Sequence, residues 1–256
     1  MGSEDRRRCD PEWFAKEDFW EVFYDSMFSP MRFDQAPEEV ESVVQLLELP
    51  PGAAVCDFCC GPGRHAVAFA QAGFATTGVD RTPYLLERAR AHAESSGVSV
   101  EWIHTDLRTF GQEERFEAAT NLYSSFGYFD TEAENLQALE NIRRSLKPGG
   151  RFLIELTPKE WIARHWLEAS AHPQGNDSLV FEFRQILDDW TRLEGTWTLL
   201  KDGRARSFQI AHFLYSGAEL RRLLYDAGFS AVVLAGDYDG EPYGIDSAKL
   251  LAIAKK

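Results

Sequence analysis

Three aspartates, each at or just after the end of a short apolar segment, could together hold a small polar ligand. Asp57 lies in the run VCDFCCGPGRH, Asp80 ends the apolar segment after it, and Asp106 follows a third one. Segments of this length and composition are typical of buried strands. Because parallel strands bring their carboxyl ends to one edge of a sheet, we expect the three carboxylates to share one crevice.

The turn after Asp57 has the composition of a loop that accepts a ligand. Gly61 and Gly63 lie where the first strand passes into the first helix. Small residues there let the backbone approach a ligand, and the helix N-terminus offers N–H groups to an anion. A carboxylate at Asp80 can accept both hydroxyls of an adenosine ribose, and Asp106 can accept the exocyclic amine of adenine. The spacing therefore predicts an adenosine-binding slot.

Two kinds of adenosine cofactor could occupy such a slot. The stretch from Gly61 to Ala66 matches the G-x-G-x-x-A pattern of dinucleotide-binding folds, with Asp80 placed for the ribose of NAD. Against this interpretation, Asp57 precedes the glycines, where a carboxylate suits an ammonium group and would repel a pyrophosphate. Antiparallel segments later in the chain also fit poorly with a second mononucleotide-binding half.

The elements expected around these residues alternate between strands and helices. This alternation favours an α/β fold with a doubly wound, Rossmann-like sheet of seven mostly parallel strands. Strands are expected at 53–58, 75–80, 98–104, 116–123, 151–156, 231–235 and 250–254. Helices are expected to begin at Pro37 and to cover 64–72, 83–96, 131–146 and 216–227, the last with Ser216 and Glu219 as a capping box.

The alternation stops after Thr157. Residues 179–187, 193–200 and 206–215 are rich in Phe, Ile, Trp and Thr, and Asp202-Gly203 indicates a hairpin between the last two. We therefore expect about three antiparallel strands, inserted as a lid.

The N-terminal region is unusually aromatic. Residues 13–33 hold eight aromatic side chains, several of them four residues apart, as on one face of a helix. Such a face packs on the core, covers a ligand pocket, or does both. The chain is thus expected to have an N-terminal aromatic helical cap at 1–35, a core at 36–158 and 216–256, and the antiparallel lid at 159–215.

Composition narrows the class of protein. The chain has 256 residues, 44% of them hydrophobic, which is enough for a substantial core. Its net charge of −14 argues against nucleic-acid and anionic-membrane partners. The four cysteines, at positions 9, 56, 59 and 60, have no second Cys/His cluster to complete a metal site, so reduced thiols and no metal are expected. No apolar run has the length of a membrane span, and a cytoplasmic protein is expected.

From about Ala36 to Lys256 the chain resembles the class I S-adenosylmethionine-dependent methyltransferases, in particular the bacterial small-molecule type with an antiparallel lid. The resemblance is carried by Asp57-x-Cys59-x-Gly61-x-Gly63, Gly78-Val79-Asp80, Asp106-Leu107-Arg108, Phe116–Leu122 with Ser125-Phe126-Gly127-Tyr128, and Leu146-Lys147-Pro148-Gly149-Gly150. The family usually has glycine where Cys59 stands.

This resemblance implies S-adenosyl-L-methionine as the cofactor. By the resemblance, Asp57 and the 59–63 loop, with Cys59, Gly61 and Gly63, hold the methionine end, Asp80 the ribose, and Asp106 with the Leu107 amide the adenine. Arg81 belongs to the same implied set, and Asn121 is expected to supply a backbone carbonyl near the methionine ammonium.

The acceptor is expected to be a small molecule. The loop Asn121-Leu122-Tyr123-Ser124 lacks the two prolines that enzymes methylating nucleobase amines or the glutamine amide carry here. The chain also contains no Pro-Cys pair for chemistry at cytosine C5. Together with the negative charge, these features point away from nucleic acid.

Several side chains are candidates for contact with the acceptor. Tyr24, Trp161, Arg184 and Tyr238 are expected to bind it, Arg184 through an acceptor carboxylate. Tyr128 and His212 are the candidate catalytic residues, because a hydroxyl acceptor generally needs a base whereas a deprotonated amine does not. The expected function is in-line methyl transfer to N or O of an amino acid-like molecule or secondary metabolite. An NAD(P)-dependent Rossmann oxidoreductase and a non-catalytic S-adenosylmethionine-binding protein stay open as alternatives.

Overall fold

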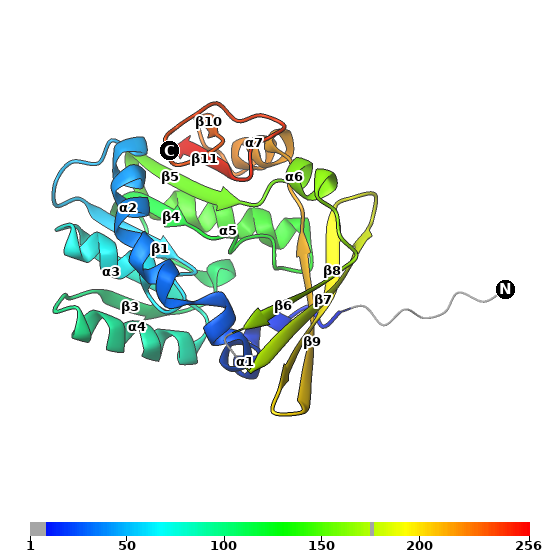
Figure 1. Cartoon of the computed structure of the whole chain (residues 1–256). Helices are drawn as coiled ribbons and strands as arrows, with labels where there is room; N and C mark the ends of the chain where they lie inside the picture. The colour runs from blue at the N-terminus through cyan, green and yellow to red at the C-terminus, as the bar shows by residue number, and fades with distance from the viewer. Residues whose placement is uncertain (1–8, 175–176) are drawn as a thin grey trace.

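The computed structural model describes residues 9–174 and 177–256. A seven-stranded sheet has the order β10-β11-β5-β4-β1-β2-β3, beside a separate four-stranded sheet (Figure 1). Its parallel strands are β1 (Ala54–Phe58), β2 (Ala75–Asp80), β3 (Glu101–His104), β4 (Phe116–Asn121) and β5 (Leu146–Leu156). β11 (Leu250–Lys255) pairs antiparallel with both β5 and β10 (Ala231–Ala235). The predicted doubly wound sheet is thus confirmed.

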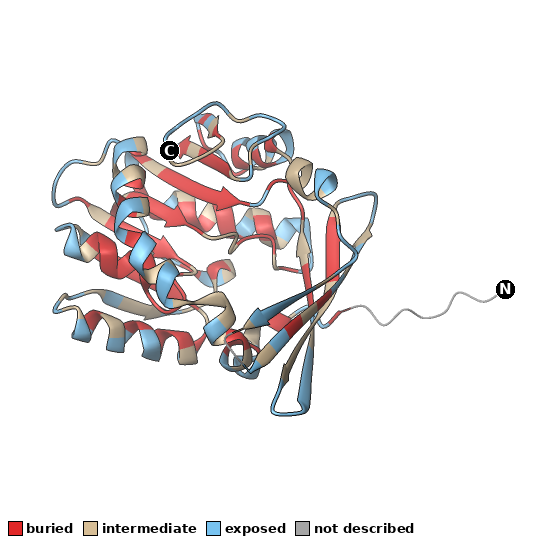
Figure 2. Ribbon diagram, viewed as in Figure 1, coloured by how far each residue is buried: buried red, intermediate tan, exposed pale blue. Residues whose placement is uncertain are grey.

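Helices cover both faces of this sheet, and Figure 2 shows its strands largely buried. One face carries α2 (Pro30–Leu46) and α3 (Arg64–Gln71), with α4 (Pro83–Ser95) against α3; the other carries α5 (Glu132–Ser145) and α7 (Gly217–Asp226). Neighbouring strand residues alternate between the two faces: Val55 packs in the cluster that contains Val43 of α2, and Cys56 in the one that contains Leu139 of α5. Burial on both faces explains the nearly continuous apolar run of β11 and that of residues 152–154 in β5.

Side-chain caps fix where two of the helices, α5 and α7, begin. Thr131 and Glu134 form a capping box at the start of α5, and Ser216 and Glu219 form the predicted one at α7.

The prediction that a helix begins at Pro37 was wrong. α2 begins at Pro30, and Pro37 lies inside it. Pro30 takes the first helical position, where a missing N–H costs nothing. An interior proline costs about 3 kcal/mol, and burial of Ala36, Val40 and Val43 on the same helix offsets it.

The inserted lid is a four-stranded antiparallel sheet rather than a three-stranded one. It has the order β6-β7-β8-β9, formed by β6 (Ala169–Gln174), β7 (Ser178–Leu187), β8 (Arg192–Lys201) and β9 (Arg204–Phe213). β6 escaped prediction because it is an edge strand whose residues are mostly exposed and include Pro173. The Asp202-Gly203 hairpin is confirmed, with φ of +52° and +70° as a type I′ turn requires. The short helix α6 (Lys159–Arg164) connects β5 to this sheet.

The N-terminal segment packs between the two sheets. It comprises the 3₁₀ turn η1 (Trp13–Ala15) and helix α1 (Glu17–Met27), which lies beside the lid strands in Figure 1. Phe19 and Phe23 are at most 1% exposed and contact Trp197 and Phe208 of the lid. The Trp13 indole N–H donates to the Ala211 carbonyl at 2.7 Å. Among the described residues, no helix is long and apolar enough to span a bilayer.

Candidate active site

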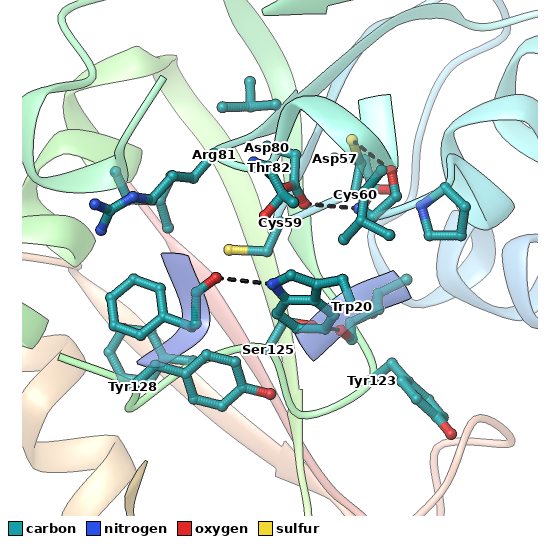
Figure 3. Close-up of a pocket in the computed structure, with 18 of the residues that line it drawn as sticks. Trp20, Asp57, Cys59, Cys60, Asp80, Arg81, Thr82, Tyr123, Ser125 and Tyr128 are labelled. Atoms are coloured by element: carbon teal, nitrogen blue, oxygen red, sulfur yellow. Dashed lines mark hydrogen bonds between the residues drawn. The ribbon is translucent and has the colours of Figure 1, made fainter. Parts of the chain in front are cut away.

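A cavity at the carboxyl ends of β1, β2 and β4, called here the strand-end cavity, brings the three aspartates together. Asp57, Asp80 and Asp106 all line it, as their positions at strand ends predicted. Side chains of the N-terminal segment form the opposite wall, namely Phe14, Trp20, Met27 and Phe28. Figure 3 shows Trp20 and Tyr128 across the cavity from Cys59 and Asp80.

The loop between β1 and α3 is shaped by left-handed backbone. Cys59, Gly61 and Gly63 have φ of +56°, +53° and +78°. A Cβ atom on Gly63 would lie 2.8 Å from the Trp102 ring, so only glycine fits there. Cys59 adopts a conformation that costs a residue with a Cβ about 1–2 kcal/mol and that glycine adopts without this cost.

Asp57 is almost completely buried at the floor of the cavity, with 2% exposure. Its Oδ1 accepts a hydrogen bond from the Thr120 hydroxyl at 2.9 Å. Its Oδ2 is buried and has no partner among the described residues. Burial raises the pKa of Asp57, although His65, Thr120 and Arg64 oppose that shift. A buried carboxylate oxygen without a partner fits a cationic donor on a ligand.

Asp80 fixes the loop and faces the same cavity. Its two carboxylate oxygens accept the backbone N–H groups of Gly61 and Thr82, each at 2.8 Å. Burial raises its pKa, opposed by these hydrogen bonds. Each oxygen keeps a further lone pair, so the carboxylate can still accept hydroxyl groups of a ligand.

The Asp106 carboxylate is already paired with two arginines, which the sequence did not predict. Arg108 donates to both of its oxygens at 2.8–3.0 Å, and Arg81 lies 3.0 Å from Oδ2. Burial opposes ionisation of Asp106, but the hydrogen bonds from Arg108 outweigh it and lower the pKa. Both arginines also bind Glu12, which ties the N-terminal segment to this rim of the cavity. Leu107, the next residue along the chain, lines the cavity as well.

Of the two further residues expected to bind the cofactor, Cys59 lines the strand-end cavity and Asn121 does not. Cys59 lines the cavity, and burial followed by the nearby Asp80 raises the pKa of its thiol well above the usual value, so it is not a thiolate. Asn121 is buried outside the strand-end cavity's lining. Its amide donates to the carbonyls of Phe58 at 3.2 Å and Ser125 at 3.4 Å, so it braces the loop after β4.

A second cavity, called here the lid chamber, lies between the lid sheet and the carboxyl edge of the large sheet. Trp161, Arg184, His212 and Tyr128 of the expected acceptor set line it. Tyr128 also lines the strand-end cavity, as do Met27, Tyr123 and Phe126, so the two cavities meet over these four side chains.

The two candidate catalytic residues lie close together in the chamber. The rings of Tyr128 and His212 are 6.3 Å apart. Burial raises the pKa of Tyr128 above its usual range, so its hydroxyl keeps its proton at neutral pH. Burial lowers the pKa of His212, so its ring is neutral. Its Nδ1 lies 3.1 Å from the Phe213 carbonyl, which assigns the proton to Nδ1 and leaves a lone pair on Nε2.

The other acceptor candidates divide between the chamber and the rest of the molecule. Trp161 stacks on His165 with ring centroids 3.7 Å apart. Arg184 forms an ion pair with Glu182 and donates to the Ser170 hydroxyl at 3.1 Å, so its charge is already matched.

Tyr24 and Tyr238 lie outside both cavity linings. Tyr24 packs against Phe28 and Tyr84, and the Tyr238 hydroxyl donates to Glu155 at 2.8 Å.

Sequence reasoning did not assign roles to Arg64, His65 and Glu39. Arg64 and His65 begin α3 and line the strand-end cavity, and both contact the same oxygen of Glu39 at 2.8 Å. The available signal was a pair of basic residues in the first turn of a helix whose other residues, apart from Gln71, are apolar. Their carboxylate partner lies on α2, where no sequence spacing links it to them.

Known proteins resemble this chain in sequence and fold. Residues 55–150 match the model of a methyltransferase domain. The cypemycin N-terminal methyltransferase of a Streptomyces species is 28% identical over 217 residues, 80% of this chain and 84% of that protein. The dTDP-3-amino-3,4,6-trideoxy-alpha-D-glucopyranose N,N-dimethyltransferase of Streptomyces venezuelae is 27% identical over 203 residues, 76% of this chain and 81% of that protein.

A solved S-adenosylmethionine-dependent methyltransferase from Clostridium acetobutylicum shares the fold with a TM-score of 0.76 at 13% identity, covering 93% of this chain and 97% of that one. The methyltransferase-domain match includes the β1–α3 loop, Asp80 and Asp106, the residues that meet in the strand-end cavity. The dinucleotide-dependent alternative is therefore set aside. Residues 55–150 therefore form a methyltransferase domain, and the chain is an enzyme, an S-adenosylmethionine-dependent methyltransferase.

Proposed function

We propose that this protein methylates an amine nitrogen of a small, largely apolar acceptor held in the lid chamber. The observation that carries the proposal is the boundary between the two cavities. Of the described residues, those that line both are Met27, Tyr123, Phe126 and Tyr128, none of which is a base at neutral pH. A neutral amine needs no base to attack, whereas a hydroxyl generally does.

The strand-end cavity would hold the cofactor, whose sulfonium supplies a methyl group already activated for displacement. The free oxygen of Asp57 would accept from the methionine ammonium, and Asp80 from the ribose hydroxyls. Arg81, Asp106 and Leu107, which also line the cavity, would bind the adenine. In their ionised forms Asp57, whose Oδ2 has no partner among the described residues, and the hydrogen-bonded Asp80 give this cavity negative charge, which complements a ligand that bears a sulfonium and an ammonium.

The protein's contribution to the reaction is alignment. Positioning of two reactants can supply about 7–11 kcal/mol of the barrier, provided that both are held rigidly. The region 1–35, whose first eight residues lie outside the described residues, would act as the cap over the cofactor, and 159–215 as the lid over the acceptor. The hydrogen bond from the Trp13 indole to the Ala211 carbonyl links the cap to the lid. The two would therefore enclose the place where the methyl group is transferred.

The walls of the lid chamber favour an acceptor with an apolar or aromatic body. Trp13, Phe19, Trp161, Trp166 and Trp197 contribute to its lining. Flat aromatic surfaces stack on rings and sugars and also attract cations. One relative is named as the cypemycin N-terminal methyltransferase and another as the N,N-dimethyltransferase of a dTDP-linked amino sugar, which supports an amine as the nucleophile.

O-methylation is the second candidate, and His212 favours it. The ring is neutral, its Nε2 is free, and it lies within the chamber. These are the properties of a general base that removes a proton from a hydroxyl.

A product screen separates the two candidates. The enzyme would be incubated with methyl-labelled S-adenosylmethionine and matched pools of amines, alcohols and phenols that share the same carbon skeletons. We expect label in the amine pool, and His212→Ala should leave that rate within about tenfold. Label confined to hydroxyl compounds, together with a loss of about 10²–10⁴-fold in His212→Ala, would refute N-methylation and establish the base.

A further inference from the structure

The charged side chains of the lid chamber are paired, with one exception. Glu182 is matched by Arg184, and Glu155 by Lys249. Arg32 lines the same chamber, and no carboxylate of residues 9–174 and 177–256 lies within the 4.0 Å ion-pair distance of its guanidinium. In a protein with a net charge of −14, the chamber therefore keeps one uncompensated positive charge.

The groups that contact the Arg32 guanidinium restrain it but do not neutralise its positive charge. Its Nη1 donates to the Met27 carbonyl at 2.6 Å, and its guanidinium lies 4.5 Å from the centre of the Tyr123 ring. Arg64 lies 5.1 Å from the same ring, but Glu39 matches that charge at 2.8 Å. Burial and the nearby Arg64 lower the pKa of Arg32, and the more distant charge of Glu39 opposes that shift only in part.

An arginine in such a position is prepared to bind an anion. The guanidinium has five N–H donors in a rigid fork, so several are left beyond the bond to Met27. The contact with the Tyr123 ring and the hydrogen bond to Met27 restrain the guanidinium, and a restrained fork favours bidentate binding of a planar carboxylate. A carboxylate there would restore the charge balance of a half-buried site at little cost in side-chain entropy.

We propose that Arg32 is the carboxylate-binding residue at the boundary between the lid chamber and the strand-end cavity. Arg32 lines the lid chamber, and the Tyr123 ring beside its guanidinium lines both cavities, so Arg32 lies next to their boundary. The two possible sources are the methionine part of the cofactor and the acceptor. The assignment rests on the proposed function only in treating the chamber as the acceptor's site.

Binding experiments without turnover test this assignment. Calorimetry would compare S-adenosylhomocysteine with 5′-methylthioadenosine, which lacks the amino acid group, on the wild type, Arg32→Gln and Arg32→Lys. If the cofactor supplies the carboxylate, Arg32→Gln should weaken S-adenosylhomocysteine binding about 10- to 100-fold and leave 5′-methylthioadenosine unchanged. Arg32→Lys, which keeps the charge but loses the fork, should lie between the two.

The acceptor as source is tested on the S-adenosylhomocysteine complex. Benzoate and its neutral isostere benzamide would be titrated into that complex while tryptophan fluorescence is monitored. If the acceptor supplies the carboxylate, the wild type should prefer benzoate, and Arg32→Gln should abolish the preference while S-adenosylhomocysteine affinity stays unchanged. Arg206→Gln is the matched control, since this lid arginine has a side chain that is 52% exposed and lies outside both cavity linings.

The two titrations together decide the assignment. A selective loss in either one supports a carboxylate site at Arg32 and identifies its source. Equal weakening of S-adenosylhomocysteine and 5′-methylthioadenosine would show a purely structural role, and no change in either titration would likewise overturn the proposal. Neither result depends on which atom of the acceptor is methylated, so this test fails or succeeds independently of N-methylation.

Discussion

Replacing Asp57 by asparagine should weaken ligand binding without lowering the stability of the free protein. The asparagine keeps the shape of the side chain and an oxygen for the Thr120 hydroxyl. It replaces the unpartnered Oδ2, however, with an N–H₂ group that cannot accept from an ammonium. The variant should bind S-adenosylhomocysteine more weakly, and the free protein should be at least as stable as the wild type.

The size of both effects follows from the burial of Asp57. One charge-assisted hydrogen bond is worth about 1.5–3 kcal/mol, so affinity should fall about 10- to 150-fold. Because burial raises the pKa of Asp57, the folded state holds its proton to a higher pH than the unfolded state. Stability is therefore lost as pH rises from the unfolded pKa through the folded one, and the uncharged asparagine removes that loss.

Thermal unfolding with and without ligand measures both effects in one experiment. At a ligand concentration 100 times the wild-type Kd, the wild type should gain about 2.7 kcal/mol, whereas a variant with 50-fold weaker binding should gain about 0.6 kcal/mol. Asp226→Asn, at an exposed carboxylate on α7, is the matched control. An Asp57→Asn protein that gains as much from the ligand as the wild type would show that Oδ2 does not face the cofactor.

Three further predictions test the packing and electrostatics around the site. Phe23→Ala should lower the free energy of unfolding by about 3–5 kcal/mol because Phe23 is 0% exposed, whereas Met31→Ala, at 63% exposed, should change it by less than about 0.5 kcal/mol; urea titration compares them. Cys59→Gly should leave S-adenosylhomocysteine affinity unchanged in calorimetry, since glycine accepts the φ of +56° without strain; a large loss would give the thiol a binding role. Because burial lowers the pKa of His212, the unfolded state binds a proton there first, and the free energy of unfolding should fall below about pH 6.5. His212→Gln should flatten this dependence, and an unaltered slope in urea unfolding at several pH values would contradict it.

The large sheet and its acidic edge could be predicted because local signals determine them. Strand and helix alternation, the capping box at Ser216 and the Asp-Gly hairpin each depend on residues adjacent in sequence. That Asp57, Asp80 and Asp106 meet follows from parallel pairing alone, since their strands end at one edge.

The features that escaped prediction depend on contacts between distant segments. Glu12 joins Arg81 and Arg108, which are far from it in sequence, and so adds the N-terminal segment to the wall of the strand-end cavity. Tyr24 was a reasonable acceptor candidate from its neighbours on α1, but the helix turns it towards Tyr84 on α4. Helical spacing shows which residues share a face and leaves open which other element that face contacts.

Some departures from ordinary folding rules lie in the walls of the two cavities. Cys59 lines the strand-end cavity and Tyr123 lines both cavities, and each has a left-handed backbone, a conformation that costs free energy and is often found at functional sites. One buried carboxylate oxygen, on Asp57, and one half-buried guanidinium, on Arg32, lack partners of opposite charge among the described residues. An α-amino acid group carries the two complementary charges, an ammonium and a carboxylate, on a single carbon. If the first titration identifies the cofactor as the source of the carboxylate, its methionine end would pair with Arg32 as well as with Asp57. Bound cofactor would then leave the lid chamber without excess charge and ready for a neutral amine.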